Sequence, residues 1–89
     1  MKDTLSEKDS GVIEDILADK LDVRREQLTP EARLMEDLGA DSLTIVEMTM
    51  ALEDQFNLAI PDERWEAVTT VGDLLEALAE LLAEQAPRT

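Results

Sequence analysis

Apolar residues recur at helical spacing in three separate segments of this chain, and no segment alternates apolar and polar residues as a half-buried strand would. The first segment contains five such residues: Val12, Ile13, Ile16, Leu17 and Leu21. Their spacing predicts a helix over residues 7–21, with Ser6 and Asp9 placed as a capping box at its start. Because Gly11 costs a helix about 1 kcal/mol relative to alanine, a start at Ser10 is the alternative.

The second segment follows Asp41 and Ser42, either of which is a good N-cap, and contains no glycine or proline as far as Phe56. It predicts a helix over residues 42–56 that ends at Asn57. An apolar stripe covers about one third of its circumference, and we expect this stripe to face the core. The stripe consists of Ile45, Met48, Thr49, Leu52 and Phe56.

A second apolar group, Leu43, Val46 and Met50, lies roughly 120° round the same helix. Glu47 and Asp54 border this group. Two apolar stripes exceed what one buried face needs, and two interpretations follow. Either the helix is packed centrally among the others, or the second group is an exposed apolar patch with an acidic rim, suited to a partner with a basic edge.

Two shorter signals complete the pattern of helices. A proline followed by two acids at residues 61–63 is typical of a helix start and predicts a short helix over residues 62–67. The threonine pair at residues 69–70, with Asp73 as a capping-box partner, predicts a last helix that ends near Glu84. Its apolar stripe consists of Val71, Leu74, Leu75, Leu78, Leu81 and Leu82.

Residues 22–40 lose the helical periodicity and include Pro30 and Gly39. A loop of this length in a small domain is usually functional or carries its own anchors. Four apolar residues are spaced to pin it to the core: Val23, Leu28, Leu34 and Leu38. We therefore expect an ordered loop with a turn near residues 29–33.

These elements predict an all-α fold: a small four-helix bundle of three main helices and one short one, with a long loop between the first two. With 89 residues, the chain has room for one domain, which we place at residues 7–84 between flexible ends at 1–6 and 85–89. Phe56 and Trp65 are the only aromatic residues, so the core must be aliphatic.

The charge balance restricts the partners of this chain. It has 22 acidic and 8 basic residues and a formal net charge of −14, which repels nucleic acids and anionic membranes and attracts proteins with basic surfaces. It has no cysteine and no histidine, so we expect no disulfide and no metal site. No apolar run suits a signal peptide or a membrane span, and we expect a cytoplasmic monomer that does not insert into membranes.

Ser42 is the only serine beyond the first ten residues, and a lone serine at a helix start is most often a cap. A nucleophilic serine needs a base and an oxyanion hole, yet the chain has no histidine and no G-x-S-x-G turn. This excludes self-contained hydrolase chemistry. A helix N-terminus does favour a phosphate, so Ser42 is well placed to carry a phosphoester that another protein installs.

Residues 36–43 read Glu-Asp-Leu-Gly-Ala-Asp-Ser-Leu, which resembles the attachment motif of acyl carrier proteins. Further matches follow in register at Val46-Glu47, residues 50–56, Ile60-Pro61-Asp62-Glu63 and Thr69-Thr70-Val71. The resemblance covers about residues 7–84. It implies that Ser42 carries a 4′-phosphopantetheine arm whose thiol holds acyl groups as thioesters. The implied function is that of a non-catalytic carrier.

The resemblance also implies partners and a surface that meets them. The partners are a phosphopantetheinyl transferase, acyl-loading enzymes, and ketosynthases, reductases or acyltransferases with basic docking surfaces. The docking residues that match family positions are Asp41, Leu43, Val46, Glu47 and Met50. Further acidic candidates for this surface are Glu53, Asp54, Asp62 and Glu66. The expected walls of a pocket that shelters the acyl chain are Ile45, Thr49, Leu52, Ile60, Trp65, Val68 and Leu74.

Three residues depart from the pattern common in fatty acid synthesis. Thr44 replaces a frequent acid, Thr49 replaces an aliphatic residue, and Trp65 occupies a place where a small residue is usual, which reduces the room for cargo. The pathway therefore stays open among fatty acid, polyketide, lipid A and other lipid synthesis. The alternatives are a peptidyl or aminoacyl carrier, and an acidic interaction module without a prosthetic group.

Overall fold

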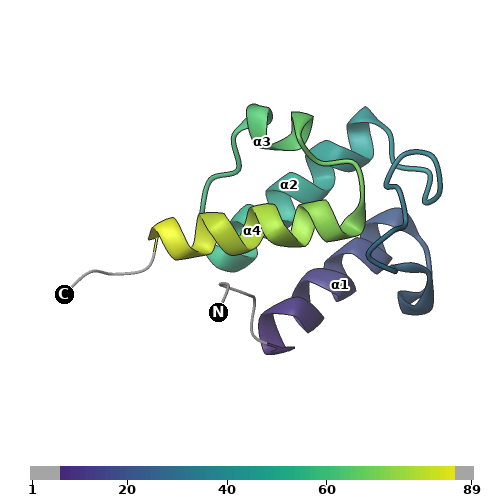
Figure 1. Cartoon of the computed structure of the whole chain (residues 1–89), viewed down its shortest axis with the longest axis horizontal. Coiled ribbons are helices and arrows are strands. Elements are labelled where there is room, and N and C mark those ends of the chain that lie inside the picture. The colour runs from purple at the N-terminus through teal and green to yellow at the C-terminus, as the bar shows by residue number, and fades with distance from the viewer. Residues whose placement is uncertain (1–6, 86–89) are drawn as a thin grey trace.

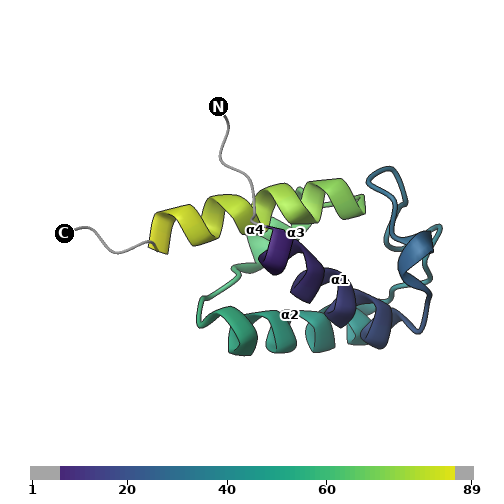
Figure 2. The same ribbon diagram turned by 90° about the horizontal axis from the view of Figure 1, so that it is seen from below.

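The computed structural model describes residues 7–85, and these form helices joined by loops with no strand longer than an isolated bridge. The main elements are α1 (Glu7–Leu21), α2 (Ser42–Phe56), α3 (Asp62–Glu66) and α4 (Val71–Gln85), with a single 3-10 turn at Arg25–Gln27. α2 and α4 lie on opposite sides of the molecule (Figure 2), and α1 and α3 lie on the two other sides, α1 below and α3 above in the view of Figure 1. The predicted all-α fold, with three long helices and one short one, is confirmed.

The helix bounds agree closely with those predicted from the sequence. α1 begins at Glu7 rather than at Ser10, and α2 has the bounds that the pattern predicts. α3 ends at Glu66, one residue before the predicted end, with Ala67 as its C-cap, and α4 includes Gln85, which the sequence predicts to lie in the tail. The remaining residues of the predicted flexible ends, 1–6 and 86–89, and with them the capping serine at position 6, lie outside the described residues.

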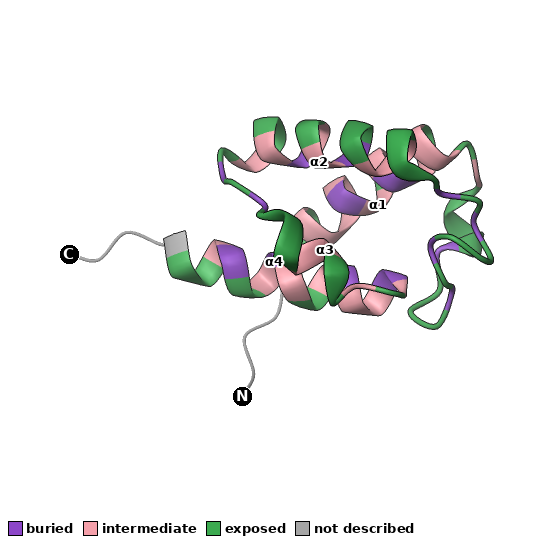
Figure 3. Ribbon diagram, turned by 90° about the horizontal axis from the view of Figure 1, so that it is seen from above, coloured by how far each residue is buried: buried purple, intermediate pink, exposed green. Residues whose placement is uncertain are grey.

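The core is aliphatic, as the composition predicts. Seven large side chains from three helices are almost completely buried: Ile13, Leu17, Met48, Leu52, Val71, Leu74 and Leu78. Half-buried Phe56 and Trp65 pack against this core from outside it. The inner stripe of α2 faces the interior, and its opposite face is exposed along the whole helix (Figure 3).

The long loop is held by backbone hydrogen bonds to the segment that opens α4. The amide of Leu34 donates to the Thr69 carbonyl at 2.9 Å, and the amide of Val71 donates to the Ala32 carbonyl at 3.0 Å. The amide of Gly72 donates to the Pro30 carbonyl, also at 3.0 Å. The first-turn amides of a helix have no acceptor within the helix, so the loop supplies the acceptors that α4 lacks.

The other expectations for the loop are met as well. The amide of Ala32 donates to the Thr29 carbonyl at 3.0 Å, which is the predicted turn. Three of the four anchors are buried, Leu28, Leu34 and Leu38, and Val23 is half-buried against the core. The 3-10 turn was not expected, and Arg25 within it binds Glu14 at 2.7 Å and Asp15 at 3.1 Å. The loop is therefore ordered by apolar anchors, ion pairs and backbone bonds together.

Thr70 and Asp73 form the predicted capping box at the start of α4. The Asp73 amide donates to the Thr70 hydroxyl at 3.1 Å, and the Asp73 carboxylate accepts from the amides of Thr69 at 3.0 Å and Thr70 at 3.2 Å. The bond from the Thr69 amide, followed by that from Thr70, holds the pKa of Asp73 below its ordinary value. The ionised carboxylate thus stabilises the turn that also receives the loop.

This cap makes a pH-dependent contribution to stability. Because the folded-state pKa of Asp73 is lowered, its contribution is present above the ordinary value of 3.8 and is lost as the pH falls through the folded-state pKa. We expect Asp73→Asn to lower the free energy of unfolding at pH 6 and to lower it less at pH 3. Urea unfolding at both pH values measures this, with exposed Asp54→Asn as the control. An equal loss at both pH values would contradict a role for the charge.

Candidate functional site

The N-terminus of α2 is capped by Asp41 and not by Ser42, the residue that follows it. The Asp41 carboxylate accepts from the Thr44 amide at 2.9 Å and from the Thr44 hydroxyl at 2.8 Å. The amide bond first, and then the hydroxyl bond, lower the pKa of Asp41. Ser42 is exposed, and its hydroxyl has no hydrogen-bond partner among the described residues. The serine is therefore not the cap and is open to modification.

The chain reaches Ser42 through a turn that depends on a glycine. Gly39 has φ = 79°, a left-handed conformation that favours glycine. The amide of Ala40 then donates to the Leu34 carbonyl at 2.9 Å, which closes the turn against the loop. Within the turn, the Asp37 carboxylate accepts from the Arg33 amide at 2.8 Å. These bonds direct the chain into α2 beside the part of the loop that is fixed to α4.

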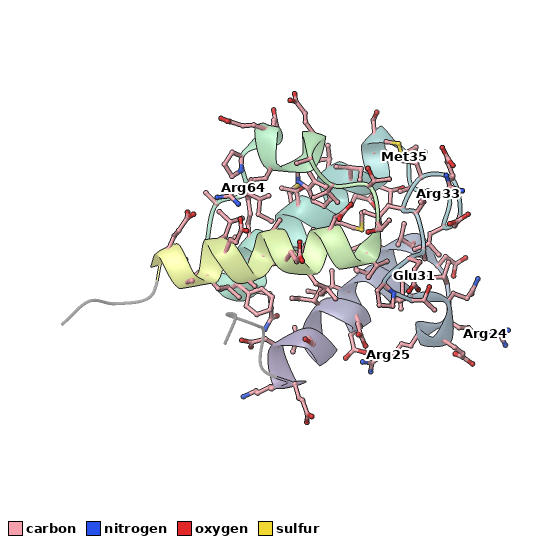
Figure 4. The ribbon with its side chains drawn as sticks, in the orientation of Figure 1. Arg24, Arg25, Glu31, Arg33, Met35 and Arg64 are labelled. Carbon is pink, nitrogen blue, oxygen red and sulfur yellow. The ribbon has the colours of Figure 1, made fainter. Side chains whose placement is uncertain are left out.

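A cleft of about 410 Å³ opens beside Ser42. Its walls come from the loop, the first turn of α2, and the segment from α3 to the start of α4. They are formed by Arg33, Leu34, Met35, Glu36, Ser42, Ile45, Trp65, Glu66, Val68 and Thr69. Arg33 and Met35 lie together on the loop near the start of α2 (Figure 4). Most of the exposed lining is apolar, so the cleft suits a guest with an apolar part.

Three of the seven expected pocket residues line this cleft: Ile45, Trp65 and Val68. The other four lie elsewhere. Leu52, Ile60 and Leu74 are buried in the core, and the Thr49 hydroxyl donates to the Ile45 carbonyl at 2.7 Å within α2. The loop wall, above all Met35, was missed by the sequence reasoning. Its position directly before the Glu-Asp-Leu-Gly motif is the only sequence signal that could have pointed to it.

The second apolar group on α2 is an exposed patch. Leu43, Val46 and Met50 are 67%, 51% and 63% exposed, which excludes the interpretation of a helix packed on all sides. Met35 on the loop is also exposed, at 59%. An exposed apolar patch of this kind on a small protein is typical of an interaction surface.

The acidic docking candidates lie at the N-cap of α2, along α2 and on α3, and one of them has a structural bond. Five of the six acidic docking candidates are exposed: Asp41, Glu47, Asp54, Asp62 and Glu66. Glu53 is half-buried, and its carboxylate accepts from the Ile60 amide at 2.8 Å, which ties the connection between α2 and α3 to α2. No group of three or more acids within residues 7–85 is arranged to hold a metal ion. No helix in this range is long and apolar enough to cross a membrane.

Comparison with known proteins gives a consistent family. The family model described as "Phosphopantetheine attachment site" matches residues 11–78. An acyl carrier protein from Syntrophobacter fumaroxidans is 52% identical over 68 residues, which is 76% of this chain and 84% of that protein. An acyl carrier protein from Helicobacter pylori is 47% identical over 68 residues, covering 76% of this chain and 87% of that protein.

A solved structure leads to the same family. It is described as a putative acyl carrier protein from Mycobacterium tuberculosis, and it matches with a TM-score of 0.72 and 31% sequence identity over 79% of this chain and 93% of that chain. Fold, attachment motif and relatives agree, so the chain belongs to the phosphopantetheine-binding carriers and, among them, to the acyl carrier protein family.

Two glycine substitutions should have opposite effects on the free energy of unfolding: one in the turn before Ser42, the other in α1. A left-handed residue with a Cβ costs about 1–2 kcal/mol, so we expect Gly39→Ala to destabilise the protein by about that amount. Gly11 lies in α1, where an added Cβ would be 3.8 Å from the nearest atom, an ordinary contact. Gly11→Ala should therefore stabilise by about 1 kcal/mol. Urea unfolding of both variants measures the difference, and a Gly39→Ala variant as stable as the wild type would contradict the turn.

Proposed function

We propose that this protein is a non-catalytic acyl carrier, in which Ser42 bears a 4′-phosphopantetheine arm. The observation that carries the proposal is the unbonded, exposed hydroxyl of Ser42 at the first position of α2, next to an apolar cleft. When bound, the arm supplies a thiol that holds an acyl group as a thioester. The residues of the chain bind and orient the arm and present it to other enzymes.

The local structure fits such an arm. The N-terminus of a helix carries a partial positive charge and unpaired amides, which favour a phosphate. Asp41 takes the capping position and so keeps Ser42 on the outside of the turn. The cleft begins at Ser42, so an attached chain can lie against Ile45 and Val68 without crossing the core.

The surface around the arm fits partners with basic docking sites. The patch of Leu43, Val46 and Met50 gives apolar contact, and the methionine allows adaptable packing. Exposed Glu47 and Asp54 lie on the same helix, so their charges attract a basic surface and guide its approach. The partners that this surface suits are the transferase that attaches the arm, and then the enzymes that load, modify and receive the acyl group.

Attachment of the arm is the direct test. We expect the intact mass to rise by one phosphopantetheine after incubation with coenzyme A, Mg²⁺ and a broad-specificity phosphopantetheinyl transferase. Ser42→Ala should gain no mass, and the matched variant Ser10→Ala, a serine in α1, should gain as much as the wild type. No gain in the wild type, while a known carrier is modified, would contradict the proposal and favour an acidic module without a prosthetic group.

The acidic rim can be tested separately from the arm. We expect Glu47→Lys to lower the association rate with the transferase about tenfold or more at low salt, because it reverses a charge beside the patch. The thermal unfolding of the variant should be nearly that of the wild type, since Glu47 is exposed.

The matched control is Glu76→Lys, which makes the same charge change at an exposed position on α4. Stopped-flow or surface-binding kinetics measure the rates. Equal slowing by both variants would show an effect of net charge alone, and no slowing by Glu47→Lys would remove this residue from the docking surface.

A further inference from the structure

The cleft beside Ser42 has an inner wall that contacts the core. Four of its apolar lining residues, Leu34, Ile45, Trp65 and Val68, also belong to the core cluster or pack against it. We call these four residues the inner wall. The completely buried side chains of α2 and α4 do not line the cleft. The inner wall therefore lies between the cleft and the centre of the core.

Trp65 has the largest side chain of the inner wall. The residue is half-buried and packs against the core, and it also lines the cleft. Its indole Nε1 is closed to solvent, so the nitrogen edge of the ring lies on the buried side. A tryptophan in this position fills more of the space between the cleft and the core than any other residue of the inner wall.

The core behind the inner wall has no exposed space for a further chain. Met48 and Leu52 are 0% exposed and Leu74 is 1% exposed. Protein interiors are close-packed, and extra methylenes forced into them strain the side chains that are already there. A saturated acyl chain that passed the inner wall would have to displace such side chains. A chain that stays in the cleft avoids this cost.

The size of the cleft limits what it can shelter. Its volume of about 410 Å³ is near the lower end of the range of roughly 300–1,000 Å³ that is usual for small-molecule sites. Because Ser42 itself lines the cleft, an arm at this serine and its cargo share this space. The room that remains suits a short or medium-length acyl group.

We infer that Trp65 is a specificity-determining residue that limits the length of the acyl cargo. The indole closes the inner side of the cleft, so the cleft shelters a short or medium-length acyl group completely, while the end of a longer chain stays in water. This inference rests on the proposed function, because it needs an arm at Ser42.

The melting temperature of loaded protein tests the inference. A group that binds only the folded state raises this temperature, and each methylene that leaves water adds to the gain. We would load the arm with butanoyl, hexanoyl, octanoyl, decanoyl and dodecanoyl groups, each joined by a stable amide. Intact mass verifies every form first, so a failure of attachment at Ser42 is distinguished from a failure of this inference.

The expected melting temperature of the wild type rises above that of the form with the arm alone, and it stops rising at octanoyl or at a shorter group. A melting temperature that still rises from octanoyl to dodecanoyl would overturn the inference, because the longer chain would then be sheltered as well. The absence of any rise across the series would also overturn it, because the cleft would then hold no cargo.

Trp65→Leu tests the role of the indole itself. The change removes no hydrogen bond, since the indole N–H has no partner among the described residues. We expect the unloaded variant to melt at a lower temperature than the wild type, and its gain to keep rising as far as decanoyl or dodecanoyl. A gain that stops at the same acyl group as in the wild type would contradict the inference.

Phe56→Leu is the matched control. Phe56 is the only other aromatic residue, and it is half-buried and packs against the core without lining the cleft. Its gain should stop at the same acyl group as in the wild type, and an extension equal to that of Trp65→Leu would assign the effect to a loosened core and overturn the inference. If Trp65→Leu does not fold, the smaller change Trp65→Phe makes the same test, with an extension of at least one step in the series expected.

Discussion

The bonds between the long loop and the start of α4 fix the geometry on which the site depends. A helix leaves its first amides without acceptors, and here the carbonyls of Pro30 and Ala32 accept from Gly72 and Val71. The approach is close: a Cβ at position 72 would lie 3.1 Å from the Pro30 carbonyl oxygen, so a glycine is suited to this place. The first amides of α4 need acceptors, and the carbonyls that supply them order the loop that leads into α2.

The excess of acids is organised around a few arginines. Arg25, Arg33 and Arg64 each bind two acidic side chains, and they tie the loop to α1, the turn to itself, and α3 to α4. Ion pairs in contact with solvent, as these are, contribute little to stability. The arginine pairs lie away from the outer face of α2, so under the proposed function the acids of that face stay available to a partner. A net charge of −14 repels itself within the fold, and in the proposed function the same charge attracts basic surfaces.

Local patterns were sufficient to predict the helices. Apolar periodicity placed α1, α2 and α4 to within one residue at the described ends, and the capping box of Thr70 and Asp73 followed from spacing alone. The choice between Asp41 and Ser42 as the cap was left open by the residues and is decided by the bonds to Thr44. That choice is central to the site, since it determines which side chain remains unbonded.

The features that escaped the sequence depend on contacts between distant segments. Met35 and Arg33 face the cleft because residues 30–34 are bound to residues 69–72, and no periodicity within the loop encodes that pairing. The bond from the Ile60 amide to Glu53 likewise ties the connection after α2 back to α2, seven residues earlier in the chain. Of the expected pocket, only Ile45, Trp65 and Val68 line the cleft. Leu52, Ile60 and Leu74 fill the core instead, and the Thr49 hydroxyl is bonded within α2.

Hydrogen exchange measured amide by amide tests most directly the claim that the loop is fixed by the start of α4. The amides of Leu34, Val71 and Gly72 are the donors in this pairing. We predict that they exchange about as slowly as interior amides of α4 such as that of Leu78, because all of them open only when the pairing or the fold is lost. Exchange of these three amides at the rate of an unstructured chain, while the Leu78 amide stays protected, would contradict the account.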